Sequence, residues 1–136
     1  MNNLNELSKQ IYEGNKLRGF DVSKENIGQT LMLVVSELAE ALEADRKDNR
    51  KMLNVFEQDL DYAKLSISDF ETENLNCDWL KNQFEATVKD TFEDEIADSF
   101  IRLFDLCGGL GIDIEKHIDL KLRYNSTRSF KHGKRY

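Results

Sequence analysis

Two pairs of acidic residues, each with its members three positions apart, are the part of this sequence best suited to chemistry. Glu37 and Glu40 form the first pair, and Glu95 and Asp98 form the second. In a helix, residues at i and i+3 are surface neighbours, so each pair would direct two carboxylates to one point. Two facing helices would then offer four carboxylates to a hard cation such as Mg²⁺, which takes oxygen ligands.

Acidic pairs at this spacing are also common on solvent-exposed helices, where they bind nothing. Around the first pair, however, Leu33, Ala41 and Ala44 lie beside the glutamates. Carboxylates among apolar side chains need a partner, because an unpaired buried charge is costly. Neither His117 nor His132 follows one of these carboxylates by three residues, as the histidines of di-iron bundles do. The residues therefore favour Mg²⁺, with Mn²⁺ as the alternative.

The first pair lies in a stretch whose apolar residues recur with helical spacing, which predicts one buried face. The residues of that face are Ile27, Leu31, Val34, Val35, Leu38 and Leu42. A cap at Asp21 or Ser23 would begin this helix, which runs to about Lys47. Because apolar residues also flank the glutamates, we expect the helix to be covered on both sides.

The second pair lies in a long helical pattern from Asp78 to Cys107. This pattern is either one helix or two helices joined near Asp90–Thr91, where Asp90 followed by Glu93 resembles a capping box. The pair Gly108–Gly109 is expected to end it. The carboxylates of the second pair would thus project from the middle of a helix.

Three further segments complete the expected architecture. Residues 3–18 form an amphipathic helix that Gly19 ends, and residues 53–63 suit another helix. Residues 67–76 are expected to be a polar connection. After Gly111, Asp113 is a plausible cap for the last helix.

Composition agrees with a single all-α domain over residues 1–136. Proline is absent, 40% of the residues are hydrophobic and 33% are charged, and no stretch alternates as a strand does. The net charge of −7 argues against nucleic acid as the main partner. No apolar run approaches membrane-spanning length, and the two cysteines, Cys77 and Cys107, are isolated thiols. We therefore expect a cytoplasmic protein without a nucleic-acid or membrane partner.

Three stretches together resemble the MazG-like, all-α nucleoside triphosphate pyrophosphohydrolases. They are SELAEALEADRK, FEDEIADSFIRLFDLCGGLGID and KLRYNSTRSFKHGKRY. The family pattern is EExxE on one helix and ExxD on another. Here Ser36 stands in place of the leading glutamate, and Glu43 is a candidate to replace it. The resemblance covers residues 1–47 and 90–136, and residues 48–89 form an insertion.

The resemblance implies a four-helix-bundle-like fold with an extra helical insertion, completed by assembly into a homodimer or homotetramer. It implies an enzyme that hydrolyses (d)NTP, with Mg²⁺, to (d)NMP and pyrophosphate, for house-cleaning of the nucleotide pool. The four carboxylates Glu37, Glu40, Glu95 and Asp98 would be the metal ligands and the catalytic residues.

The basic end of the chain would bind the substrate phosphates. The residues for this role are Lys121, Asn125 and Arg128, with Lys131 and Lys134 from the basic tail at 125–136. The sequence also allows a protein that is no enzyme: a helical module that oligomerises, or that binds metal or nucleotide for regulation. Pyrophosphate release from a panel of nucleotides, with and without Mg²⁺, distinguishes the two.

Overall fold

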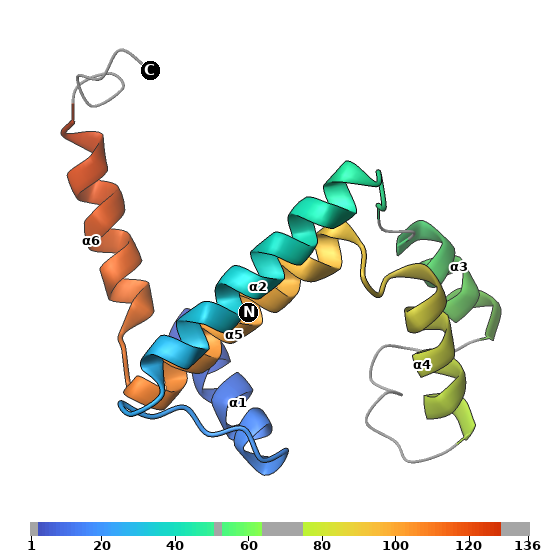
Figure 1. The fold of residues 1–136 in the computed structure, drawn as a ribbon, viewed down its shortest axis with the longest axis horizontal. Coiled ribbons are helices and arrows are strands. Elements are labelled where there is room, and N and C mark those ends of the chain that lie inside the picture. Colours follow the sequence, from blue (N-terminus) through green and yellow to red (C-terminus); the bar gives the residue numbers. More distant parts are fainter. Residues whose placement is uncertain (1–2, 51–52, 64–74, 129–136) are drawn as a thin grey trace. The chain divides into compact units, whose positions relative to one another are not determined.

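Every regular element that the structure describes is an α-helix. The computed structural model describes residues 3–50, 53–63 and 75–128 (Figure 1). The helices are α1 (Leu4–Leu17), α2 (Ile27–Arg46), α3 (Leu53–Ala63), α4 (Leu75–Thr87), α5 (Phe92–Leu110) and α6 (Ile114–Ser126). The predicted all-α class is confirmed. None of the helices in the described ranges has the length and apolar character needed to cross a membrane.

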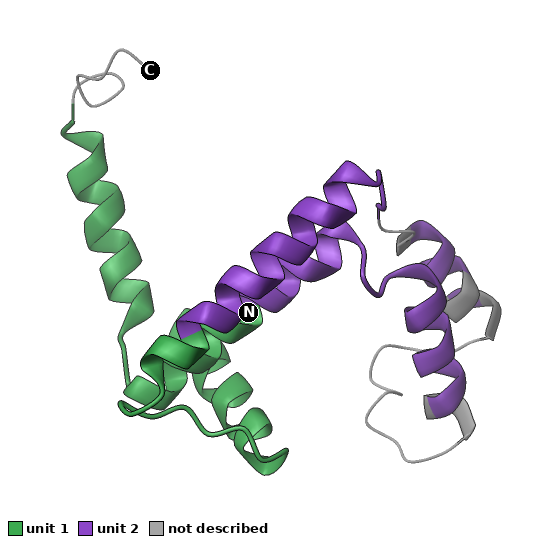
Figure 2. Cartoon of the chain, in the orientation of Figure 1, with its two compact units in different colours: residues 1–30, 101–136 green, residues 31–100 purple. Residues whose placement is uncertain are grey.

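The chain divides into two compact units (Figure 2). Unit 1 contains residues 1–30 and 101–136, and unit 2 contains residues 31–100. The four acidic residues of the sequence pattern all belong to unit 2. The basic residues expected to bind phosphate belong to unit 1.

Unit 1 is held together by a close approach between α1 and α5. An alanine Cβ at Gly108 would lie 2.3 Å from the backbone oxygen of Ser8 and 2.8 Å from Cβ of Tyr12. Only glycine fits such a contact. The expectation that Gly108–Gly109 ends the helix is therefore wrong: α5 continues to Leu110, and Gly111, with a φ of 65°, follows it.

Replacing Gly108 by alanine is expected to destabilise the protein by about 2–3 kcal/mol, because the added carbon meets backbone that cannot swing aside. Gly28→Ala is the matched control, since a Cβ at Gly28 of α2 meets no atom within 4 Å. Alanine is the better helix former, so this control should gain about 0.5–1 kcal/mol. Urea unfolding of both variants measures the difference. Equal unfolding midpoints would show that α1 does not approach α5 in this way.

In unit 1, side chains cap the N-terminal ends of α1 and α6. Asn3 caps α1 by accepting from the Glu6 N–H at 2.8 Å. Asp113 caps α6, as predicted, by accepting from the Lys116 N–H at 3.1 Å. The Asn5 side chain also donates to Asp113 at 2.8 Å, which lowers the pKa of that carboxyl. The cap of α6 therefore also joins α6 to α1.

The beginning of α2 differs from the prediction. Neither Asp21 nor Ser23 caps the helix, which begins at Ile27. The Ser23 N–H donates to the Asn26 side chain at 2.8 Å, and the Asn26 amide donates to the Asp21 carbonyl at 2.7 Å. These local bonds compete with helix formation and hold residues 21–26 in a turn.

In unit 2, α2 and the first part of α5 lie side by side (Figure 1). Of the two alternatives for this pattern, one helix or two, the structure has two: α4 ends at Thr87, and Asp90 adopts a φ of 60° before α5 begins. The Asp90 N–H donates to the Asp94 carboxylate at 3.0 Å, so the capping carboxylate comes one residue later than the expected Glu93. Of the expected connection at 67–76, residues 67–74 lie outside the described residues, and α4 already begins at Leu75.

The insertion at 48–89 contributes a small apolar core between α3 and α4. Phe56 of α3 and Leu80 of α4 are buried, and Trp79, Phe84 and Val88 pack against them. The rings of Phe56 and Phe84 meet edge to face, with 6.2 Å between their centroids. Phe56, Trp79 and Phe84 are therefore engaged in packing.

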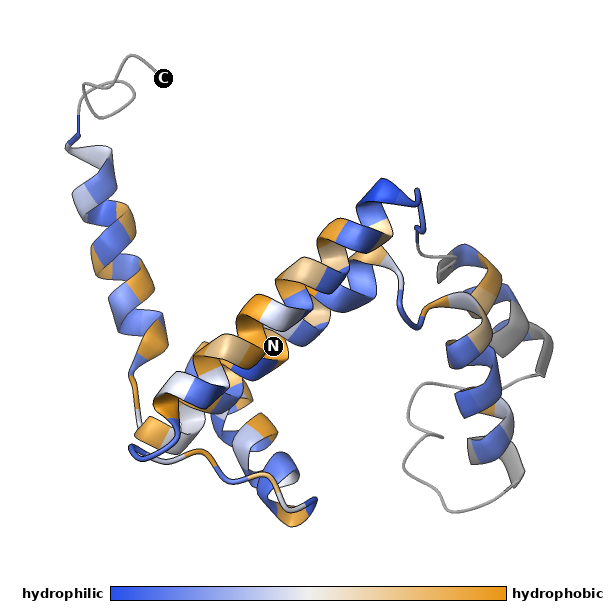
Figure 3. Cartoon of the chain, in the orientation of Figure 1, coloured by the Kyte–Doolittle hydropathy of each residue, from blue (hydrophilic) through white to orange (hydrophobic). Residues whose placement is uncertain are grey.

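The buried face of α2 is not the face that the apolar periodicity predicts. Val34 is buried, but its buried neighbours are Glu37, Ala41 and Ala44. Four residues of the predicted face are exposed at 45–52%: Leu31, Val35, Leu38 and Leu42. We call these four residues the α2 stripe. Hydrophobic residues recur along α2 (Figure 3), yet in the described part of the chain the side of Glu37 is buried and the α2 stripe is exposed.

Candidate metal site

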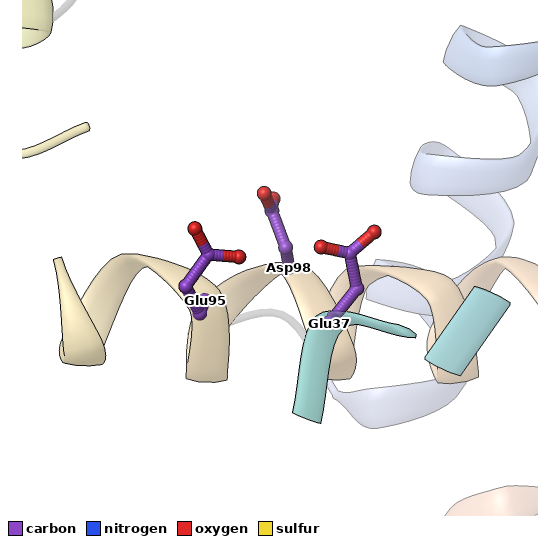
Figure 4. Close-up of side chains that lie close together, drawn as sticks. All are labelled: Glu37, Glu95 and Asp98. Atoms are coloured by element: carbon purple, nitrogen blue, oxygen red, sulfur yellow. The ribbon is translucent and has the colours of Figure 1, made fainter. Parts of the chain in front are cut away.

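Three of the four predicted carboxylates converge. Glu37 of α2 and Glu95 and Asp98 of α5 each offer an oxygen, and these oxygens all lie within 4.8 Å of one another. Their carboxylates point to the same side of the two helices (Figure 4). Alanines at positions 41 and 44 supply small side chains on the same buried face of α2, so this helix can approach α5 closely. The i, i+3 spacing on α5 then completes the group.

Burial and mutual repulsion make an ionised Glu95 carboxylate unfavourable without a cation. Glu95 is only 5% exposed and Glu37 only 7%. Burial, followed by the charges of Glu40, Glu37 and Asp98, raises the pKa of Glu95 to about 7. Among the described residues, no hydrogen-bond donor or cation contacts the Glu95 carboxylate. A divalent cation fits the donor set, because it would supply the missing positive charge to hard oxygen ligands.

The fourth predicted carboxylate lies beside the group of three. Glu40 and Glu95 both line an open cavity of about 390 Å³ between α2 and α5, which we call the α2–α5 groove. Ser36, the residue that departs from the family pattern, also lines it and donates its hydroxyl to the Glu40 carboxylate at 3.4 Å. Glu43 lines the groove as well, but its carboxylate pairs with Arg46. Serine at position 36 therefore contacts the catalytic candidate Glu40.

The residues expected to bind phosphate gather at the end of α6. Lys121 lies over the Tyr124 ring, 5.1 Å from its centroid, and the Arg128 guanidinium lies 5.8 Å from the same centroid. The side-chain oxygen of Asn125 is buried and has no hydrogen-bond partner among the described residues. These three residues belong to unit 1, and Lys131 and Lys134 lie outside the described residues.

Sequence reasoning missed one buried carboxylate. Asp105 of α5 is buried, and within the described part of the chain one of its oxygens has no hydrogen-bond partner. Burial raises its pKa, although a hydrogen bond from Asn15 of α1 and the charge of Arg102 act in the opposite direction. Its place between Phe104 and Leu106 on the apolar side of α5 is the signal that could have identified it.

Replacing Asp105 by asparagine is expected to stabilise unit 1 by about 1 kcal/mol at pH 8. A raised pKa in the folded state means that stability falls as the pH rises through that pKa, because the buried carboxyl must then ionise. The gain should vanish below pH 3.8, the ordinary pKa of aspartate, because Asp105 is then protonated in both the folded and the unfolded chain. Urea unfolding at pH 8 and at about pH 3 tests this. A pH-independent difference between the two proteins would contradict it.

The structure thus defines an all-α protein in which two neighbouring helices present a compact group of carboxylates suited to a divalent cation. Comparison of the chain with models of protein families, with curated proteins and with solved structures found no match.

Proposed function

We propose that the protein is a Mg²⁺-dependent nucleoside triphosphate pyrophosphohydrolase of the MazG-like kind, with Mn²⁺ as an alternative cation. The convergence of Glu37, Glu95 and Asp98 carries this proposal. The sequence resemblance supplies the reaction, in which (d)NTP and water give (d)NMP and pyrophosphate. Clearing unwanted nucleotides from the cytoplasmic pool is the role that this activity would serve.

The chain's own residues divide the work as follows. Glu37, Glu95 and Asp98 hold the cation, which when bound supplies positive charge to the phosphates and lowers the pKa of a water molecule. Glu40 lies outside the group of three but lines the same groove as Glu95. It is therefore the carboxylate we assign to accept the proton of the attacking water, with the Ser36 hydroxyl orienting it.

Pyrophosphate release from a panel of ribonucleoside and deoxyribonucleoside triphosphates tests the proposal. We expect at least one of them to give the monophosphate and pyrophosphate in a 1:1 ratio, and only when Mg²⁺ or Mn²⁺ is present. Release of orthophosphate instead, or no turnover of any nucleotide, would contradict it.

Assembly with further copies of the chain is the second part of the proposal. The α2 stripe, composed of Leu31, Val35, Leu38 and Leu42, has the alternating spacing of four and three residues that packs one helix against another. Between 45% and 52% of each side chain is exposed in the single chain. In an antiparallel pair of α2 helices Leu31 would meet the partner's Leu42, so the stripe is complementary to itself. A homodimer through α2, or a tetramer built from such dimers, would cover it.

The exposed α2 stripe equally suits the alternative function, a helical module that oligomerises without catalysis. Among the described residues, no donor or cation contacts the buried Glu95 carboxylate, which is costly. A module that only oligomerises would have no use for such a group, whereas a regulatory module that binds metal would. The sequence resemblance keeps the enzyme as our first proposal, and turnover separates the two.

A further inference from the structure

The α2–α5 groove contains one basic residue among several acidic ones. Lys47 lines it together with Glu40, Glu43, Asp90 and Glu95. Within the described ranges, Lys47 forms no salt bridge with any of these carboxylates. The described carboxylates of the groove therefore leave its ammonium group to a ligand there.

The loop that follows Lys47 is held firmly to the beginning of α5. The Asn49 amide donates to the Asp90 carbonyl at 2.7 Å, and the Phe92 N–H donates to the Asn49 carbonyl at 3.0 Å. The Arg50 guanidinium also stacks on the Phe92 ring, 4.5 Å from its centroid. These contacts fix the backbone that follows Lys47 to the beginning of α5.

Glu95 requires a positive charge from a ligand in the same groove, whereas Lys47 requires a negative one. It is a carboxylate 95% removed from solvent, it lines the groove, and no described donor or cation contacts it. A ligand that fills the groove must therefore present positive charge to Glu95 and negative charge to Lys47. A phosphate chain that carries a divalent cation has this arrangement of charges.

We propose that the α2–α5 groove binds the pyrophosphate half of the nucleotide and that Lys47 contacts its phosphate oxygens. This inference rests on the proposed function and assigns a role that the sequence did not suggest for Lys47. When the water oxygen bonds to the α-phosphorus, the bond from that phosphorus to the bridging oxygen breaks, and the bridging oxygen leaves with the pyrophosphate. Lys47 offsets the charge that this leaving group gains.

Binding of pyrophosphate with Mg²⁺ to the full chain, measured by calorimetry, tests the inference without turnover. Lys47→Gln should weaken this binding by about tenfold to a hundredfold, the usual effect of losing a charged hydrogen bond. In product inhibition, the same variant should raise the inhibition constant of pyrophosphate and leave that of the nucleoside monophosphate unchanged. Lys81→Gln on α4 is the control, because Lys81 is exposed and does not line the groove.

The outcomes separate this inference from the proposed function. Equal pyrophosphate binding by Lys47→Gln and the unaltered chain overturns the inference even if the enzyme hydrolyses nucleotides. Binding that depends on Lys47, in a protein that turns over no nucleotide, supports the groove and contradicts the enzyme. Absence of pyrophosphate binding to the unaltered chain overturns the inference outright.

Discussion

Replacing Glu95 by glutamine is expected to lower kcat/KM for Mg²⁺-dependent pyrophosphate release by at least about a hundredfold. The glutamine keeps the size of the side chain but removes the charge at the centre of the carboxylate group. Glu95 lies within 4.8 Å of the ligand oxygens of Glu37 and Asp98, and it also lines the groove that contains Glu40. The cation would therefore lose its contact with the Glu95 carboxylate, and the phosphates bound to the cation would be held less well. A pyrophosphate assay at saturating Mg²⁺ measures the effect.

The same substitution, although it lowers turnover, should increase the stability of the metal-free protein. The pKa of Glu95 is about 7 in the folded chain, against an ordinary value of 4.5. Stability that is present below pH 4.5 is therefore lost as the pH rises through 7, because the buried carboxyl must release its proton. Glutamine cannot ionise, so Glu95→Gln should unfold at a higher urea concentration than the unaltered chain at pH 8.

Glu57→Gln on α3 is the matched control, since Glu57 is exposed and its substitution changes the charge by the same amount. It should leave turnover and the pH dependence of unfolding unchanged. If Glu95→Gln keeps full turnover, the group of three carboxylates is not the active site. If the unaltered chain has no turnover but Glu95→Gln is still more stable at pH 8, the raised pKa of Glu95 is supported and the alternative function is favoured.

The convergence of Glu95 and Asp98 could be predicted because it depends on local geometry, whereas the same spacing does not bring Glu40 into the group with Glu37. A spacing of three residues in a helix fixes the relative direction of Glu95 and Asp98 whatever the rest of the fold does. The apolar residues beside Glu37 indicated that a second helix covers it. The role that we propose for Lys47 could not be predicted, because it depends on the contact between the Asn49 loop and the beginning of α5. Asn49 and Asp90, which form one of these bonds, are 41 residues apart in the sequence.

The buried face of α2 shows where apolar periodicity reaches its limit. Apolar residues recur with helical spacing on two faces of α2, one that contains Leu38 and one that contains Ala41. The larger side chains lie on the face of Leu38, but this chain buries the face of Ala41. Periodicity identifies a face that must avoid water without identifying what covers it. Gly108 was misinterpreted for a related reason, because the close approach of α1 is invisible in the local sequence.

Replacing Leu38 by glutamate is expected to convert the proposed oligomer into monomers, raising its dissociation constant by at least about a hundredfold. Leu38 lies inside the α2 stripe and is 48% exposed in the single chain. In a two-fold symmetric interface the substitution occurs twice, and each buried carboxylate would lack a partner. The single chain should tolerate the change, because the side chain is not part of its own core. Analytical ultracentrifugation over a range of protein concentrations measures the constant.

Val55→Glu on α3 is the control for a general effect of added charge, since Val55 is an exposed apolar residue outside the α2 stripe. It should leave the dissociation constant unchanged, and circular dichroism should show the same helical content for both variants. A chain that is monomeric before substitution, or an oligomer that Leu38→Glu does not weaken, would contradict assembly through α2. Comparing turnover of the Leu38→Glu monomer with that of the oligomer then decides whether the carboxylates of one chain suffice, because Leu38 lies on a different face of α2 from Glu37.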